Sequence, residues 1–287
     1  MKNRYKMKLS VIGLGLLGGS LALDLRKRKF ADSVIGYDKN PVHSAFAKQV
    51  GIIDEEVSFD EAVAQGDIII VAVPVSAVVK ILPQILDKVN ERQIVIDVAS
   101  CKGTICERVK YHQNRKRYVA CHPMAGTENS GPWSAISGMF DGKAFIICDA
   151  EDSDEKAVAT IRDMFEVLNM NPMFFNSYNH DIHVAYVSHI PHVCSFALAL
   201  TVLEKEKNEK NIFNLASGGF KSTVRLAKSN AEMWTPIFHD NKENVLSVLD
   251  TYIEKLKDFR TLLQNGDTDG MDNYINQANR VKKVLNK

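Results

Sequence analysis

The sequence lacks the features that mark several large classes of protein. Its five cysteines are an odd number without a Cys-x-x-Cys pair, so they indicate neither a disulfide framework nor a zinc site, and a reducing cytoplasm is the expected location. Lys and Arg number 36 against 35 Asp and Glu, and this net charge of +1 gives no reason to expect nucleic acid or an anionic membrane as a partner. The apolar run Leu9–Leu17 is short and broken by glycines, so neither a signal peptide nor a membrane span is expected there.

The sequence does have enough apolar residues for large cores, because 45% of its 287 residues are hydrophobic, and two domains are expected. From Lys8 to about Ala150, short β-branched runs alternate with amphipathic stretches, which is typical of a parallel sheet covered by helices. A helix over Asp154–Leu168 and a strand over Met173–Asn176 extend this pattern. Asp67–Val73 is apolar on both faces, as a central strand must be. The other expected strands are Leu9–Gly13, Ser33–Tyr37, Gln93–Val98, Tyr118–Cys121 and Ala144–Cys148.

After about Ser177 the sequence shows no strand-like run, and its long periodic stretches are helical. These stretches are Ile182–Leu203, Val245–Leu263 and Thr268–Leu285. The first is apolar nearly all round, which is typical of a helix buried in a domain core or a subunit interface, and it predicts a homodimer joined through the helical part. We therefore expect an α/β domain over residues 1–177 and an all-helical domain over residues 178–287.

A glycine-rich turn, Gly13-Leu-Gly15-Leu-Leu-Gly18, follows the first expected strand and opens a helical pattern. The first glycine allows a tight turn, the second lets the backbone approach a pyrophosphate, and the third packs the helix on the strand. An ordinary strand–helix turn is the alternative, but the flanking strand and helix are the context that the dinucleotide interpretation requires. The sequence therefore predicts a doubly wound Rossmann-type domain with Gly13, Gly15, Leu16, Leu17 and Gly18 at the cofactor.

Asp38 ends the second expected strand, about 20 residues past the last glycine of the turn, where a ribose-binding acid is expected. A carboxylate there accepts hydrogen bonds from ribose hydroxyls and repels a 2′-phosphate, so NAD is expected to be preferred over NADP. Lys39 would relax this preference without reversing it. The alternative is that Asp38 caps a helix starting near Pro41.

Several later segments carry a more specific pattern. They are Ala72-Val-Pro74, Asp97-Val-Ala-Ser100-Cys-Lys102, His122-Pro-Met-Ala-Gly126-Thr-Glu128, Ser188-His-Ile-Pro-His192 and Gly218-Gly-Phe-Lys-Ser-Thr-Val-Arg225. Together with the glycine turn, these segments resemble the prephenate and arogenate dehydrogenase family in order and spacing, from about Lys8 to Lys283. The resemblance implies a Rossmann domain, a helical domain that builds the dimer, and a substrate between them. It also implies cofactor contacts from Val73, Pro74, Ser76 and Ser100.

The resemblance further implies an oxidative decarboxylation, in which a hydride leaves the ring carbon that bears a hydroxyl, the ring carboxylate departs as carbon dioxide, and the ring becomes aromatic. His122 is expected to accept the hydroxyl proton, because it ends an expected strand and histidine's pKa of about 6.5 suits proton transfer at neutral pH. Ser100 is expected to hydrogen-bond the substrate hydroxyl and His122. The alternatives are a turn histidine before Pro123 and, for Ser100, a helix cap.

His189 and His192 lie three residues apart, on one face of an apolar helix. Such a pair can suggest a metal, but no third ligand stands at useful spacing and the chemistry needs no Lewis acid once NAD accepts the hydride, so no metal is expected. The resemblance places both in the substrate pocket, with His192 against the pyruvyl side chain, and buried structural histidines are the alternative. Trp234 matches an aromatic that lines this pocket, although a tryptophan on a helix is usually core.

Arg225 is expected to hold the ring carboxylate, because a dianionic substrate needs a fixed cation and the guanidinium pairs bidentately with a carboxylate. Lys221 is the next candidate, and an exposed helix arginine is the alternative. Glu128 resembles the family acid that helps hold the site closed, with a surface-loop glutamate as the alternative. Ser222 stands where the family often has an acid, so the ion network around Arg225 is expected to be weaker or rearranged. For Lys102, a place near the cofactor and a solvated one both stay open.

The motifs leave two substrates open, prephenate and arogenate, which differ in a keto oxygen or an amino group on the route to tyrosine. A different class is a catalytically idle dinucleotide sensor. Ser100, His122 and Arg225 together argue against it, because a sensor has no use for a proton acceptor. Any inhibition by tyrosine is expected to act at the active site, since the helical domain reaches the end of the sequence.

Overall fold

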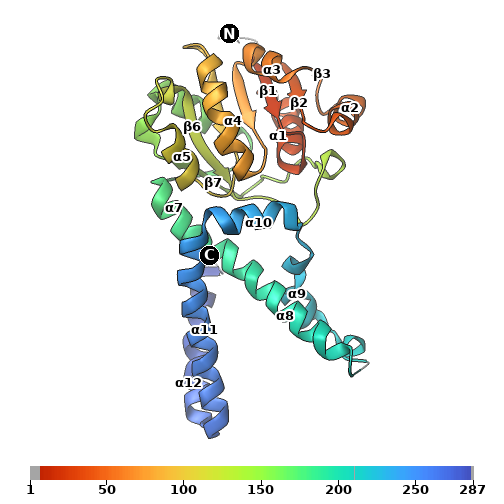
Figure 1. The fold of residues 1–287 in the computed structure, drawn as a ribbon, viewed down its shortest axis with the longest axis vertical. Coiled ribbons are helices and arrows are strands. Elements are labelled where there is room, and N and C mark those ends of the chain that lie inside the picture. The colour runs from red at the N-terminus through yellow and green to blue at the C-terminus, as the bar shows by residue number, and fades with distance from the viewer. Residues whose placement is uncertain (1–6, 210, 286–287) are drawn as a thin grey trace. The chain divides into compact units, whose positions relative to one another are not determined.

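A computed structural model describes residues 7–209 and 211–285 and separates the chain into two compact units, Met1–Asn241 and Lys242–Lys287 (Figure 1). The first unit contains an eight-stranded sheet in the order β3-β2-β1-β4-β5-β6-β7-β8. Neighbouring strands are parallel except for the antiparallel pair β6 and β7. The strands are β1 Lys8–Ile12, β2 Ser33–Tyr37, β3 Glu55–Glu56, β4 Ile68–Val71, β5 Ile94–Asp97, β6 Tyr118–Pro123, β7 Ala144–Cys148 and β8 Asn171–Phe175.

The predicted α/β fold with a mostly parallel sheet is confirmed, and every expected strand is present close to its expected position. Only β3 was not expected, because its two exposed glutamates carry no apolar pattern. β4 shows why a wholly apolar run indicates a central strand. Ile68 and Ile70 pack into the core on one face of the sheet, and Ile69 and Val71 pack into the core on the other.

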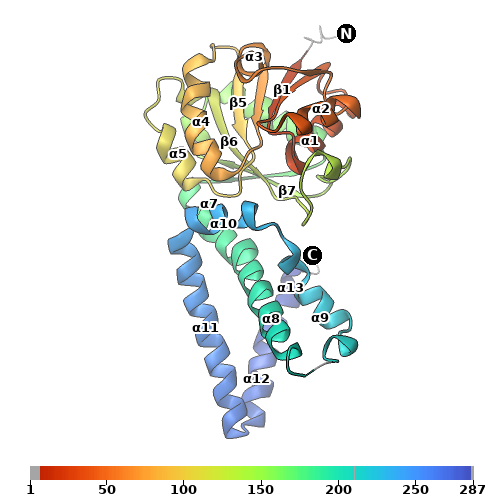
Figure 2. The ribbon, with the colours of Figure 1, turned by 45° about the vertical axis from the view of Figure 1, so that its right-hand side comes forward.

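Helices cover both faces of this sheet (Figure 2). Side chains of α1, α2 and α6 complete the core on one face, and those of α3, α4 and α5 complete the core on the other. The carboxyl ends of β1, β4, β5 and β6, which run parallel to one another, therefore meet at one edge between the two helix layers. The helices are α1 Leu16–Lys27, α2 Pro41–Gln49, α3 Phe59–Gln65, α4 Val75–Lys88, α5 Gly103–Val109 and α6 Glu155–Val167.

The remainder of the first unit is helical. One continuous helical run consists of α7 (Ser177–Val184), the π-helical turn η4 (Ala185–His189) and α8 (Ile190–Glu206). The expected helix Ile182–Leu203 is confirmed, but its π turn was not predicted. Such a turn changes which face α8 presents relative to α7. The shorter elements are η5 Phe213–Leu215, α9 Gly218–Thr223, η6 Arg225–Lys228 and α10 Ala231–Asp240.

Two further features concern these helices. α10 contributes Trp234 and Ile237 to the same core as α4, which joins it to the sheet domain. The run Ser177–Glu206 is long and apolar enough to cross a membrane by length and composition alone, and 17% of its most apolar window is buried within the chain. The expectation that this helix lies in a domain core is therefore wrong for most of its length, and the expectation of a subunit interface remains. Tyr186 and Leu200 are among its exposed apolar side chains.

The second unit contains α11 (Lys242–Asn265), α12 (Thr268–Ala278) and the short α13 (Lys282–Leu285), which confirms the last two expected helical stretches. Gly266, with φ of +62°, makes the turn between α11 and α12. The Tyr274 hydroxyl donates a hydrogen bond to the Lys255 carbonyl at 3.0 Å, which ties the two helices together. Strands give way to helices near Ser177, and the domain boundary expected there stays a prediction.

Candidate active site

The glycine turn has the shape that a dinucleotide requires. Gly13 adopts φ of +98°, and a Cβ there would lie 2.4 Å from the carbonyl oxygen of Ala72, so only glycine fits. A Cβ on Gly18 would lie 2.0 Å from the carbonyl oxygen of Gly13. At Gly15, in contrast, a Cβ would meet no atom within 4 Å among the described residues, and none of their side chains caps the helix that begins at Leu16. Open backbone at a helix N-terminus fits a pyrophosphate.

Asp38 is tied to the glycine turn. Its Oδ2 accepts a hydrogen bond from the amide of Leu14 at 2.8 Å, and its Oδ1 accepts one from the amide of Asn40 at 2.8 Å. Asn40 is the residue that caps α2, so the capping alternative for Asp38 is wrong. The Asp38 side chain keeps 14% of its surface exposed beside His43, whose Nδ1 lies 3.4 Å from Oδ1. A carboxylate in this place fits ribose hydroxyls.

The other expected cofactor residues lie at the same edge of the sheet. Pro74 precedes α4 as its N-cap residue, and Ser76 is exposed in the first turn of that helix. Val73 is half-buried and packs close to Gly13. Leu16 is buried and Leu17 is half-buried at the start of α1. These residues follow β1 and β4, two neighbouring parallel strands, and their contact with NAD stays a prediction.

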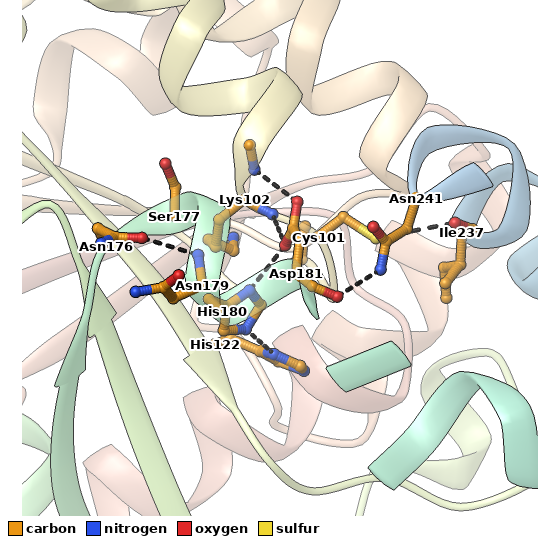
Figure 3. A network of polar contacts seen from close by, with 12 residues as sticks. Cys101, Lys102, His122, Asn176, Ser177, Asn179, His180, Asp181, Ile237 and Asn241 are labelled. Atoms are coloured by element: carbon orange, nitrogen blue, oxygen red, sulfur yellow. Dashed lines mark hydrogen bonds and ion pairs between the residues drawn. The ribbon is translucent and has the colours of Figure 1, made fainter. Parts of the chain in front are cut away.

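Three buried polar side chains form a chain of hydrogen bonds at the end of β6 (Figure 3). His122 Nδ1 lies 2.8 Å from His180 Nε2, and His180 Nδ1 lies 2.7 Å from Asp181 Oδ1. His122 comes from β6, whereas His180 and Asp181 come from the first turns of α7. The other ring nitrogen of His122, Nε2, has no hydrogen bond to any residue of the described ranges 7–209 and 211–285.

Asp181 is held in place from two further sides. Its Oδ1 accepts a hydrogen bond from the amide of Lys102 at 2.8 Å, and its Oδ2 accepts one from the amide of Gly103 at 2.8 Å. These amides open α5, so a carboxylate from α7 caps that helix, and the alternative that Ser100 caps it is wrong. The Asp181 carbonyl also accepts a hydrogen bond from Asn241 Nδ2 at 2.7 Å. The carboxylate therefore has little freedom to move.

Lys102 is fully buried and forms an ion pair with Asp97. The other oxygen of Asp97 accepts a hydrogen bond from the Tyr118 hydroxyl at 2.6 Å. Burial opposes the charge of Lys102, but the Asp97 carboxylate outweighs this effect and raises the pKa of the lysine, so it stays cationic. A solvated Lys102, one of its two expected environments, is therefore wrong.

The surroundings of His122 disfavour its protonation. Burial, followed by His180 and the cationic Lys102, holds the pKa of His122 well below its usual range. The imidazole is therefore neutral at neutral pH, which is the state that can receive a proton.

His189, His192 and Trp234 form an aromatic cluster. The rings of His192 and Trp234 stack with centroids 3.4 Å apart, and His189 meets the same indole edge-on at 5.9 Å. Burial lowers the pKa of both histidines, that of His189 to about 4. Trp234 Nε1 is a buried donor that has no hydrogen-bond partner in the part of the chain that the structure describes. The three residues are buried, and a contact with the substrate stays a prediction for each.

Arg225 and Glu128 come together loosely. Arg225 Nη1 lies 4.0 Å from Glu128 Oε2, with 60% of the arginine side chain and 34% of the glutamate side chain exposed. The Ser222 hydroxyl donates to the Gly219 carbonyl at 2.9 Å, within its own helix. Lys221 is exposed on α9. The pair of Arg225 and Glu128 is therefore loose, and the effect of Ser222 on it stays a prediction.

Ser100 and His180 depart from the sequence interpretation in opposite ways. Ser100 is half-buried just after β5, and among the described residues no hydrogen bond joins it to His122. The sequence motifs single out neither His180 nor Asp181. The pairing of His180 with His122 joins residues 58 positions apart, and no local spacing rule signals such a contact.

Comparisons with known proteins show the family of the chain. Two family models match, the nucleotide-binding domain of prephenate dehydrogenase over residues 21–171 and its dimerization domain over residues 176–277. The prephenate dehydrogenase of Bacillus subtilis is 28% identical over 286 residues, which cover 99% of this chain and 77% of that protein.

Two crystal structures extend the likeness over the fold. That of prephenate dehydrogenase from A. aeolicus, in complex with hydroxyphenyl propionate and NAD+, is 29% identical with a TM-score of 0.88 and covers 100% of both chains. That of Synechocystis arogenate dehydrogenase is 28% identical with a TM-score of 0.79, over 97% of this chain and 99% of the other. Since the nucleotide-binding model alone matches more than half of the sequence, the chain belongs to the prephenate dehydrogenase family of oxidoreductases.

Proposed function

We propose that the protein oxidises prephenate with NAD to 4-hydroxyphenylpyruvate and carbon dioxide, a step of tyrosine biosynthesis in the cytoplasm. The observation that carries the proposal is the buried, neutral imidazole of His122 at the end of β6. The glycine turn after β1 and Ser100 after β5 lie at the same edge of the sheet, where open α/β sheets bind their ligands. Five cysteines, four of them buried, fit a reducing compartment.

The residues at this edge divide the chemistry between them. Bound NAD supplies the hydride acceptor. Ser100 hydrogen-bonds the ring hydroxyl of the substrate and orients it toward His122. His122 accepts the hydroxyl proton, which favours departure of the hydride from the same carbon. The ring carboxylate then leaves as carbon dioxide, and aromatisation makes the step irreversible.

The remaining site residues hold the substrate. Arg225 pairs with the ring carboxylate, with Lys221 as a second cation, and Glu128 keeps the arginine near the site. The His192 and Trp234 stack packs against the pyruvyl side chain, beside His189. The orphaned Trp234 Nε1 supports this placement, because a buried donor without a partner is costly unless a ligand satisfies it.

Prephenate is favoured over arogenate by the positive charge of Arg225 near His192. Arg225 is near enough to His192 to help burial lower the pKa of that histidine, so positive charge is already present where arogenate would bring an ammonium group. Steady-state assays with NAD and each substrate test the choice. We expect kcat/KM for prephenate to exceed that for arogenate by about tenfold or more. A higher value for arogenate would assign the protein as an arogenate dehydrogenase.

We also propose a homodimer joined through the helical domain. The matched dimerization domain includes η4, with the exposed Tyr186 and Val187, and α8, with the exposed Leu200, and these apolar side chains need cover from water. Light scattering at micromolar concentration should give the mass of two chains, and a monomer would refute the proposal.

Any inhibition by tyrosine is expected to be competitive with prephenate, because tyrosine shares the product's ring and carboxylate.

A further inference from the structure

The hydrogen-bond chain behind His122 has a direction. His180 Nδ1 faces Asp181 Oδ1 at 2.7 Å, and a carboxylate only accepts hydrogen bonds, so the neutral His180 carries its proton on Nδ1. His180 Nε2 is then an acceptor, and His122 Nδ1, at 2.8 Å, must donate to it. This leaves the lone pair of His122 on Nε2, the ring nitrogen that no described residue occupies.

From this geometry we propose that His180 and Asp181 are positioning residues that fix the tautomer of His122 and take over the positive charge when it accepts the substrate proton. The inference rests on the proposed function, in which His122 receives that proton. The transfer is balanced without a further reactant. The hydroxyl proton moves to His122 Nε2, the proton on His122 Nδ1 moves to His180 Nε2, and His180 becomes an imidazolium that donates to both Asp181 and His122.

The charges around the two imidazoles explain why the second transfer is favourable. His122 lies near Lys102 and His189 as well as His180, so an imidazolium at His122 would be buried close to the fixed cation of Lys102. An imidazolium at His180 would instead contact the Asp181 carboxylate directly. Because the amides of Lys102 and Gly103 and the Asn241 side chain hold Asp181, this carboxylate is in place before the substrate binds.

Substitutions of His180 test the proposal without removing the cap that Asp181 provides for α5. His180→Leu deletes the acceptor for His122 Nδ1, and we expect kcat to fall by about 100-fold or more while the Kd for NAD stays within about twofold. His180→Gln offers an amide oxygen to His122 but cannot carry the proton onward, so the loss should be smaller. His183→Gln is the matched control, because His183 is an exposed histidine of the same helix and outside the chain of hydrogen bonds.

The pH profile separates this role from a structural one. In the wild type, kcat/KM should fall at low pH, because a further proton on the hydrogen-bonded pair of His122 and His180 removes the free lone pair of His122. In His180→Gln the proton can no longer be held next to the Asp181 carboxylate. The low-pH side of the profile, the acid limb, should therefore move to lower pH. Loss of activity in both variants with an unmoved acid limb would overturn the proposal.

Nitrogen NMR of histidine-labelled protein gives a readout that does not depend on turnover, with His122→Asn used to assign the signal. Above the acid limb, His122 should carry its proton on Nδ1 in the wild type and in His183→Gln, and should lose this preference in His180→Leu. A wild-type His122 protonated on Nε2 would overturn the proposal even in an active enzyme. If the protein turned over neither substrate, the proposed function would fail while the tautomer still reported on the hydrogen-bond chain.

Discussion

The two ends of the proposed site are built differently. At the proton-accepting end, His122, His180 and Asp181 are buried, and their hydrogen bonds are 2.7–2.8 Å long. At the carboxylate-holding end, Arg225 is 60% exposed and its contact with Glu128 is 4.0 Å long. The first end is organised before the substrate arrives, whereas the second takes its geometry from the carboxylate it binds. Damage to the first should therefore appear mainly in kcat, and damage to the second mainly in KM.

The largest effect is expected from His122→Asn, at the proton-accepting end. It removes the base but keeps a side chain of similar polarity, so kcat should drop by about 10²- to 10⁴-fold. The Kd for NAD should hardly change, because the residues expected to bind the cofactor, the glycine turn and Asp38, follow β1 and β2 and not β6. Steady-state kinetics and NAD titration measure both quantities, and a near-normal kcat between about pH 6 and 9 would remove His122 from the mechanism.

The buried ion pair of Lys102 and Asp97, near the proton-accepting end, should contribute strongly to the free energy of unfolding. Lys102→Met leaves the Asp97 carboxylate buried without its cation, and we expect the free energy of unfolding to decrease by about 3–5 kcal/mol. Denaturant unfolding at one fixed protein concentration measures the change. The matched control is Arg225→Ala, which removes an exposed cation and should alter stability by only about 0.5 kcal/mol. Equal effects of the two substitutions would contradict the contrast between the two ends.

Arg225→Ala should instead act on substrate binding. Loss of a bidentate pair with the ring carboxylate is expected to be worth about 2–4 kcal/mol, which corresponds to a rise of roughly 30- to 1000-fold in the KM for prephenate. The KM for NAD should stay nearly constant, and Arg225→Lys should rescue only part of the loss because it lacks the planar fork. If the KM for prephenate stayed unchanged in the alanine variant, Lys221 would become the candidate for the carboxylate.

The smallest of these effects concerns the choice of cofactor. Asp38 repels a 2′-phosphate, so kcat/KM should be about tenfold or more higher with NAD than with NADP. Asp38→Asn keeps the hydrogen-bonding shape and removes the charge, which should narrow this ratio and leave kcat with NAD little changed. An equal or reversed preference in the wild type would refute the assignment of Asp38.

The same contrast separates what the sequence could predict from what it could not. The glycine turn, the strand β4 and the place of Asp38 follow local rules of spacing and apolar pattern, and the structure has them where they were expected. The contact between His122 and His180 depends on how α7 packs against β6, and the π turn at Ala185–His189 has no simple sequence pattern. The sequence left the environment of Lys102 open, because its pairing with Asp97 is recognised only in the folded structure.

The most direct test of the central claim is a product balance with the wild-type protein. The protein is incubated with NAD+ and prephenate, and NADH, 4-hydroxyphenylpyruvate and carbon dioxide are measured in the same sample. Oxidative decarboxylation predicts equal amounts of all three. Tight binding of NAD+ without turnover of prephenate or arogenate would contradict the claim and indicate a dinucleotide sensor instead.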